Sequence, residues 1–241
     1  MLLVGLCSLT ASAHDFEYRG IFYNIISEDD LTVEVTFQGD SYDSYSHEYS
    51  GRAVFSSTVT YNGIIYSVTR IGDNAFSGCS SLTSITIPEG VTSIGYRVFL
   101  GCSSLTSITI PESVTSIGEY AFYNCSRFTS ITIPKNVTDI DQYAFSGCYS
   151  LTSITCEALV PPLTYRNAFR QVSTDIPIYV PAASLEEYKL ANDWGYFNNF
   201  IALEPEPDPE HTITYTIDGE IFKSESLLPG TPITLPEAPI K

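Results

Sequence analysis

Apolar and polar positions alternate in a fixed 23-residue pattern through the middle of the chain. In the stretch from Val91 to Ser113, Leu105, Ile108 and Ile110 are apolar and hydroxyl residues stand between them. The same phrase runs without a gap in four copies, which begin at Val68, Val91, Val114 and Val137. Consecutive repeats of this length predict a solenoid in which each copy forms one coil. One copy alone has too small a core to fold, so the copies depend on stacking.

Each copy divides into two arms. In the first arm, Leu105, Ile108 and Ile110 follow the L-x-x-L-x-L spacing of a leucine-rich repeat strand, which turns its apolar side chains inward. Pro111 ends this strand because proline has no N–H for the ladder. In the second arm, residues 94–102, apolar side chains recur at helix-like spacing. We therefore expect a β-rich right-handed solenoid with a short helical turn on the outer side of each coil.

Phenylalanine and cysteine repeat with the same period, at Phe76, Phe99, Phe122 and Phe145 and at Cys79, Cys102, Cys125 and Cys148. Six cysteines in an exported chain are compatible with a disulfide framework. A recurring position that needs a small apolar side chain instead favours a column of buried thiols. Cys156 stands where the preceding copy has Ile133, so we expect it in the core, whereas Cys7 lies in the leader segment.

The phrase V-T-S-I-G-E-Y-A-F-Y-N-C-S-R-F-T-S-I-T-I-P resembles the BspA-type leucine-rich repeat of bacterial cell-surface proteins. The resemblance covers residues 68–163 closely, and residues 164–203 resemble the degenerate terminal repeat of that family. It implies a secreted or surface-displayed protein without catalytic residues. Some members of the family bind host extracellular-matrix proteins, so it also implies adhesion or another protein–protein interaction.

The segments before the repeats predict a leader and a cap. Residues 1–13 are apolar and end in Ala-Ser-Ala, the pattern of a signal-peptide cleavage site, although no basic residue precedes the apolar run and the true start can lie upstream. Residues 14–67 predict a β-rich N-terminal cap that hides the open edge of the first coil. Strands are expected at Ile21–Ile26 and Leu31–Phe37, and Asn62-Gly63 predicts a hairpin.

The segments after the repeats predict a second cap, a linker and a tail. Residues 164–203 should form the degenerate repeat and C-terminal cap, with a helix over 182–192. Five apolar residues are expected to close the last coil: Trp194, Tyr196, Phe197, Phe200 and Ile201. Alternating proline and acid over 204–211 indicates a stiff linker. Residues 212–241 contain a hairpin signal at Asp218-Gly219 and resemble the start of a β-grasp-type domain, incomplete because it is too short to be stable alone.

Charge and chemistry exclude several functions. The net charge of -17 disfavours nucleic acid and anionic membranes, and its simplest role is solubility. After the leader no segment is long enough to span a membrane. The histidines, His14, His47 and His211, belong to no catalytic or zinc motif. A glycosidase would need paired acids where the repeat strands carry serine and threonine. We expect no enzyme activity, no cofactor and no metal.

Two surfaces are candidates for binding a protein or a glycan. The outward strand positions should form two hydroxyl columns on the concave face, made by Ser84, Thr86, Ser107, Thr109, Ser130, Thr132, Ser153 and Thr155. Small β-favouring residues on a solvated sheet explain the same pattern without any ligand. The loop at 41–50 offers aromatic anchors at Tyr42, Tyr45 and Tyr49. The sequence thus leaves three functions open: an adhesion or interaction module, a stalk that displays other domains, and a glycan-binding accessory module.

Overall fold

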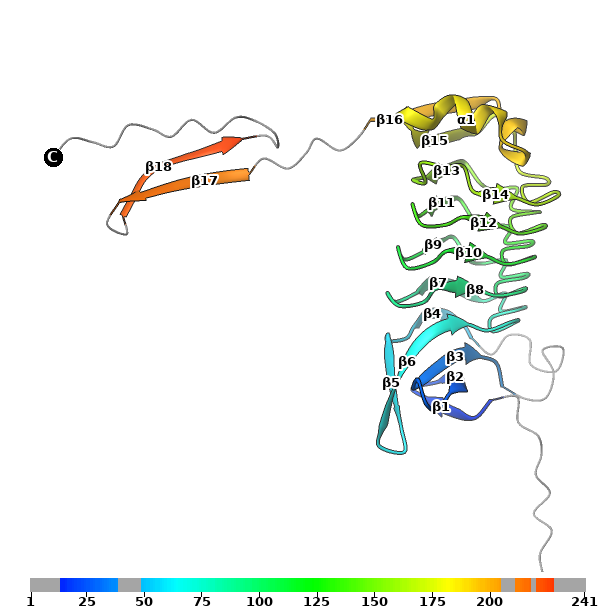
Figure 1. Cartoon of the computed structure of the whole chain (residues 1–241). Helices are drawn as coiled ribbons and strands as arrows, with labels where there is room; N and C mark the ends of the chain where they lie inside the picture. The colour runs from blue at the N-terminus through cyan, green and yellow to red at the C-terminus, as the bar shows by residue number, and fades with distance from the viewer. Residues whose placement is uncertain (1–13, 39–48, 205–210, 218–219, 228–241) are drawn as a thin grey trace, which may run out of the picture. The chain divides into compact units, whose positions relative to one another are not determined.

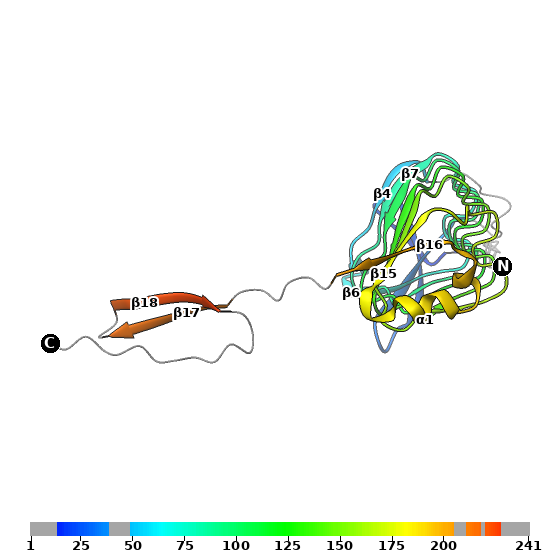
Figure 2. The same ribbon diagram turned by 90° about the horizontal axis from the view of Figure 1, so that it is seen from above.

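The computed structural model describes residues 14–38, 49–204, 211–217 and 220–227, and the chain forms two compact units with a boundary between Leu203 and Glu204. The first unit is a stack of coils built mainly of short β-strands (Figure 1). Seen along the stack, successive coils lie over one another (Figure 2). Strand pairs such as Ser84 with Ser107 join residues 23 positions apart. The predicted leucine-rich repeat solenoid and its period are therefore confirmed.

The strands of the first unit form two sheets. The nine-stranded sheet contains, in spatial order, β1 (Phe16–Tyr18), β2 (Ile21–Ser27), β3 (Thr32–Thr36), β6 (Ile64–Ile71), β8 (Ser93–Ile94), β10 (Ser116–Ile117), β12 (Asp139–Ile140) and β14 (Leu163–Thr164), with β5 (Thr58–Tyr61) paired to β6. The seven-stranded sheet contains β16 (Asn199–Leu203), β15 (Pro177–Pro181), β13 (Ser153–Cys156), β11 (Ser130–Ile133), β9 (Ser107–Thr109), β7 (Leu82–Thr86) and β4 (Gly51–Val54). Within the repeats the pairings are parallel.

The second arm of each coil turns the corner without forming a helix. The N–H groups of Arg97, Phe99 and Gly101 donate to carbonyl oxygens of the next coil at 2.9, 2.7 and 2.8 Å. A helix would direct these groups back into its own segment. The residues between them close tight turns instead, for example from Leu100 N to Arg97 O at 3.2 Å. The expected helical turn is thus a series of turns, because hydrogen bonds to the neighbouring coil replace those within a helix.

A column of phenylalanine rings forms the centre of the core. Phe76, Phe99, Phe122 and Phe145 are fully buried, and neighbouring ring centroids are 5.4, 5.2 and 5.0 Å apart with nearly parallel planes. Phe169 continues the column at 5.6 Å. Each ring therefore has an aromatic neighbour in the coils above and below, an arrangement that no single coil could supply.

Cysteine side chains line the same core. The five described cysteines, Cys79, Cys102, Cys125, Cys148 and Cys156, are buried and form no disulfide, which confirms the prediction of buried thiols. Three of the thiols also connect coils: Cys102, Cys125 and Cys148 donate to the carbonyl oxygens of Phe76, Phe99 and Phe122, each at 3.1 Å. Cysteine suits this position because it is small and apolar yet carries a weak donor.

Threonine hydroxyls form two further ladders between coils. Beside the nine-stranded sheet, in the residue before each short strand, Thr92 donates to the carbonyl of Thr69 at 3.2 Å, and Thr115 and Thr138 continue the series. Beside the seven-stranded sheet, likewise in the residue before a strand, Thr106, Thr129 and Thr152 each donate to the carbonyl of the threonine one coil earlier. These hydroxyls reinforce the backbone ladder and are occupied within the protein.

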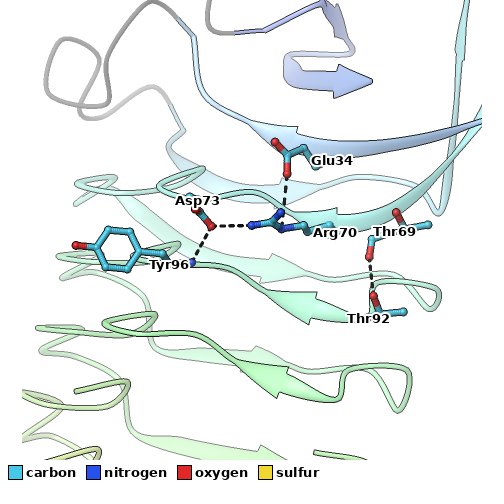
Figure 3. Close-up of polar contacts among 6 residues, drawn as sticks. All are labelled: Glu34, Thr69, Arg70, Asp73, Thr92 and Tyr96. Atoms are coloured by element: carbon cyan, nitrogen blue, oxygen red, sulfur yellow. Dashed lines mark hydrogen bonds and ion pairs between the residues drawn. The ribbon is translucent and has the colours of Figure 1, made fainter. Parts of the chain in front are cut away.

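The N-terminal cap contains the predicted strands and hairpin. β2 and β3 pair antiparallel, and β3 then joins β6 in parallel, so that the cap continues the nine-stranded sheet. β5 and β6 form the hairpin, with Asn62 and Gly63 both at positive φ, as a type I′ turn requires. Arg70 links the cap to the coils: its guanidinium lies 3.7 Å from Glu34 of β3 and 2.8 Å from Asp73 (Figure 3).

The C-terminal cap contains the predicted helix, as η1 (Ala182–Ser184) and α1 (Leu185–Leu190), followed by the turn η2 (Asp193–Tyr196). Trp194 and Phe197 are buried against Phe169 and end the phenylalanine column, as expected. Tyr196 and Ile201 were expected there too, but 70% and 38% of their surfaces are exposed. Ile201 is turned outward by strand alternation in β16, and Tyr196 lies at the exposed end of η2.

The second unit contains a hairpin of β17 (His211–Ile217) and β18 (Glu220–Leu227), which pair antiparallel. The hairpin predicted around Asp218-Gly219 is thereby confirmed, although these two residues lie outside the described ones. The β-grasp assignment remains a prediction. The leader at 1–13 likewise lies outside the described residues.

Replacing Phe122 by alanine should lower the free energy of unfolding by about 3–5 kcal/mol, because a cavity replaces a ring that is stacked on both sides. Urea unfolding followed by circular dichroism measures the change. Thr109→Ala, on the exposed side of the adjacent strand, is the control and should change the value by less than about 0.5 kcal/mol. A small loss for Phe122→Ala would mean that the ring column does not hold the coils together.

Replacing Gly101 by alanine should cost about 1–2 kcal/mol. Gly101 has φ of 71°, and no atom lies within 4 Å of an added Cβ, so the cost is that of the left-handed backbone alone. Asn124 occupies the same position in the next coil at φ of 58°. Gly101→Asn should therefore be clearly milder than Gly101→Ala in the same unfolding assay. Equal losses would refute the conformational explanation.

Burial raises the pKa of the Cys102 and Cys125 thiols well above the ordinary value, and that of Cys156 to about 11. Unfolded thiols ionise near pH 8.5, whereas these folded ones stay neutral, so ionisation favours the unfolded state as pH rises. The free energy of unfolding should fall above about pH 8.5. The double variant Cys102→Ala, Cys125→Ala should show a shallower fall, and an unchanged slope would contradict this assignment.

Candidate interaction surface

The predicted hydroxyl columns lie together on the outer face of the seven-stranded sheet, here called the hydroxyl face. Strand pairing forms a serine column, with Ser84 beside Ser107 and Ser130 beside Ser153. It also forms a threonine column in the order Thr86, Thr109, Thr132, Thr155, each beside the next. All eight side chains are exposed or half-buried. Neighbouring hydroxyl positions are therefore about one strand spacing apart, roughly 4.8 Å.

These eight hydroxyls differ from the threonines of the ladders. Thr106 and Thr129, each one residue before a strand of the same sheet, donate to carbonyl oxygens of the protein. Within the part of the chain that the structure describes, no hydrogen bond joins the eight hydroxyls to other protein groups. Each of them keeps one donor and two acceptor positions available. The sheet thus carries one set of hydroxyls that stabilises the stack and another set that faces outward.

Larger side chains continue the two columns beyond the repeats. On β4, Arg52 pairs with Ser84 and Val54 pairs with Thr86. At the other end, Tyr179 of β15 pairs with Thr155 and with Ile201 of β16. Val54 is 56% exposed and Ile201 is 38% exposed. The hydroxyl face is therefore framed by a cationic and apolar end on β4 and by an aromatic and apolar end on β15 and β16.

None of these end residues is among the predicted binding residues, and Ile201 was expected to close the last coil. Tyr179 and Ile201 lie after the period slips at 160–162, and Arg52 and Val54 lie before the first regular copy. The available signal was strand alternation: Ile178 and Val180 are apolar and buried, which turns Tyr179 outward.

One edge of the hydroxyl face is hollowed and acidic. Thr109 and Thr132 line a hollow of about 350 Å³ together with Glu89, Glu112 and Glu157. Lys135 lies 3.7 Å from Glu112 and partly balances the charge. Desolvation, and then repulsion from Glu112, raises the pKa of Glu157 above its ordinary value. This edge would attract a donor or cationic group of a partner and repel an anionic one.

The tyrosine loop is only partly described. Tyr42 and Tyr45 lie outside the described residues. Tyr49 is buried, in contrast to the expectation that it is a surface anchor: its ring packs on Phe76 at 4.7 Å, and its hydroxyl donates to the carbonyl of Thr36 at 2.9 Å. Tyr49 is thus a core residue of the N-terminal cap, because an aromatic ring is needed there to cover the first member of the phenylalanine column.

A second polar region lies on the nine-stranded sheet. Asp73 accepts from Arg70 at 2.8 Å and from the N–H of Tyr96 at 3.0 Å, which connects the cap to the second repeat (Figure 3). Beside it, Arg97 lies over the rings of Tyr96 and Tyr120 at 4.7 and 5.4 Å. These partners are committed to one another, so this region stabilises the coils. Among the described residues, no group of histidine, cysteine and acidic side chains could hold a metal ion.

The stacked coils, the parallel sheets and the flat polar face define a leucine-rich repeat solenoid. The BspA type leucine rich repeat model matches residues 50–174 in six copies, which is about half of the chain. The chain belongs to the BspA type leucine rich repeat family. Repeat proteins of this kind are generally scaffolds for binding other proteins.

The chain is similar to several solved structures, and one with a TM-score above 0.5 supports the fold. A leucine rich repeat protein of T. pallidum is 22% identical with a TM-score of 0.57, and the match covers 78% of this chain and 82% of that one. A leucine-rich repeat protein of Bacteroides capillosus is 28% identical with a TM-score of 0.48, over 58% and 96% of the two chains. A leucine rich cell surface protein of Faecalibacterium prausnitzii is 24% identical with a TM-score of 0.46, over 86% and 57%. No curated protein matches the chain.

Proposed function

We propose that the protein is a non-catalytic, secreted or surface-displayed module that binds another protein through the hydroxyl face. The observation that carries the proposal is the set of eight outward hydroxyls, held in register and unused by the protein itself, with larger side chains at both ends. Host extracellular-matrix proteins are the partner class that the family resemblance favours. The net charge of -17 favours a partner with basic groups near the acidic edge.

The dimensions of the hydroxyl face suit a protein partner. From β4 to β16 the sheet spans six strand spacings, or roughly 29 Å at about 4.8 Å each. Hydroxyl hydrogen bonds contribute only about 0.5–1.5 kcal/mol each, so useful affinity requires a contact of about 1,200 Å² or more. Tyrosine and arginine are the residue types that most often anchor such contacts. Tyr179 and Arg52 stand where such anchors are needed.

Export supports the same proposal. The leader pattern at 1–13 and the family resemblance both favour a location outside the cell. Among the described residues, no helix is long and apolar enough to cross a membrane. One observation favours the stalk hypothesis: a second compact unit begins at Glu204. A solenoid that is followed by another unit can serve to display that unit.

We expect a pull-down with the purified chain from extracellular-matrix extract to yield a protein that binds in isolation. Thr109→Lys with Thr132→Lys should then weaken binding at least about a hundredfold, because two bulky cations enter the middle of the contact. Tyr179→Ala should weaken it at least about tenfold through the loss of an aromatic anchor. Surface plasmon resonance with the isolated partner measures both effects.

The matched control is Ser93→Lys with Ser116→Lys, which adds the same charge to the nine-stranded sheet. This variant should bind normally. If it loses binding to the same degree as the threonine variant, the effect is one of net charge. Normal binding by the threonine variant would exclude the hydroxyl face and favour the stalk, whereas selective binding of matrix polysaccharide in place of protein would favour the glycan-binding function.

A further inference from the structure

A hollow of about 340 Å³ opens at the end of the phenylalanine column. Its floor is apolar and consists of Phe169, Val172 and Phe197, all buried. Its rim carries Arg170, Asp193 and the largely exposed ring of Tyr196. A volume of this size lies at the lower end of the range for small-molecule sites, and a mainly apolar lining with a few polar groups is typical of them.

The hollow holds one group of each charge. Arg170 is exposed, and within the described part of the chain no acidic group lies at ion-pair distance from it. Asp193 accepts a hydrogen bond from the N–H of Ala168 at 3.0 Å through one carboxylate oxygen. That bond fixes its position, and the other oxygen has no recorded partner among the described residues. A fixed carboxylate and an uncommitted guanidinium thus border the same apolar floor.

The backbone at the rim departs from the repeat. From Phe145 to Phe169 the spacing is 24 residues, one more than the period. Gln171 lies two residues after Phe169, at the position that glycine holds in three earlier coils and Asn124 in a fourth, and it has φ of 66°. In this coil the position therefore carries a polar side chain that lines the hollow.

We propose that this hollow binds a free apolar α-amino acid. Arg170 would hold the α-carboxylate by paired hydrogen bonds, and Asp193 would receive the α-ammonium group. The side chain would lie on the rings of Phe169 and Phe197, where removal of apolar surface from water contributes most of the affinity. A zwitterion has no net charge, so the field of a chain with a net charge of -17 does not repel it as it would a simple anion. The site is independent of the hydroxyl face.

Isothermal titration calorimetry of the whole chain tests the proposal with three probes. L-phenylalanine carries both charged groups, L-phenylalaninamide lacks the carboxylate, and N-acetyl-L-phenylalanine lacks the ammonium group. L-phenylalanine should bind with Kd of about 1 mM or below, and each capped probe at least about tenfold more weakly. Trp194 is the only tryptophan in the chain and its ring centroid lies 4.9 Å from that of Phe169, so its fluorescence should change on binding.

Variants assign the binding to this site. Arg170→Gln should weaken the binding of L-phenylalanine at least about tenfold. It should leave the affinity for L-phenylalaninamide unchanged, because that probe has no carboxylate for Arg170 to hold. Asp193→Asn keeps an acceptor for the N–H of Ala168. It should weaken the binding of L-phenylalanine but not that of N-acetyl-L-phenylalanine, which has no ammonium group for Asp193 to receive. Arg166→Gln removes an exposed arginine that does not line the hollow and should have no effect.

Three outcomes would overturn the proposal. One is no measurable binding of L-phenylalanine at about 10 mM, well above any Kd that the site should have. Another is capped probes that bind as well as L-phenylalanine. The third is loss of binding in Arg166→Gln to the same degree as in Arg170→Gln, which would show a general effect of charge. Circular dichroism of each variant confirms that it is folded before titration.

Discussion

The structure depends on one constraint, that each coil must hydrogen-bond to the coil above and the coil below. Backbone N–H groups of both sheets and of the turn arm donate from one coil to the next. This requirement fixes the length of each copy, since equivalent residues of successive coils must lie over one another, about 4.8 Å apart. It also explains why the turn arm is not helical: its N–H groups are needed by the neighbouring coil. A coil without neighbours would leave these groups and its aromatic ring uncovered.

Columns of like side chains follow from that constraint. Inside the stack, repetition is favourable because rings stack on rings and thiols donate to carbonyl groups one coil away. On the surface, repetition of charge would be costly, since like charges would meet at one strand spacing. Serine and threonine avoid that cost. At the acidic edge, desolvation and then repulsion from Glu112 raise the pKa of Glu157. A solenoid of this kind is therefore suited to recognition by an extended surface, with special chemistry only where the period breaks.

Much of the fold could be predicted because the same pattern of apolar, aromatic and hydroxyl positions recurs in each copy of the repeat. The inward positions of Leu105, Ile108 and Ile110, the phenylalanine and cysteine columns and the hydroxyl columns all follow from the period and from strand alternation. The cap strands and hairpins were predictable from local turn and strand signals, whereas features with neither a repeated nor a local signal could not be predicted. Tyr49 looked like a loop anchor because its neighbours are polar, yet it fills the space above Phe76. The hollow beside Phe169 is lined by residues that are far apart in sequence, such as Arg170 and Phe197, so no local pattern could indicate it.

The central claim is that the outward hydroxyls of the seven-stranded sheet serve a partner while the ladder threonines serve the stack. Threonine methyl NMR of the labelled chain, before and after addition of an isolated partner, tests this most directly. The methyl signals of Thr86, Thr109, Thr132 and Thr155 should shift or broaden, while those of Thr92, Thr115 and Thr138 beside the other sheet should stay unchanged. The opposite pattern, with changes confined to the nine-stranded sheet, would contradict this claim.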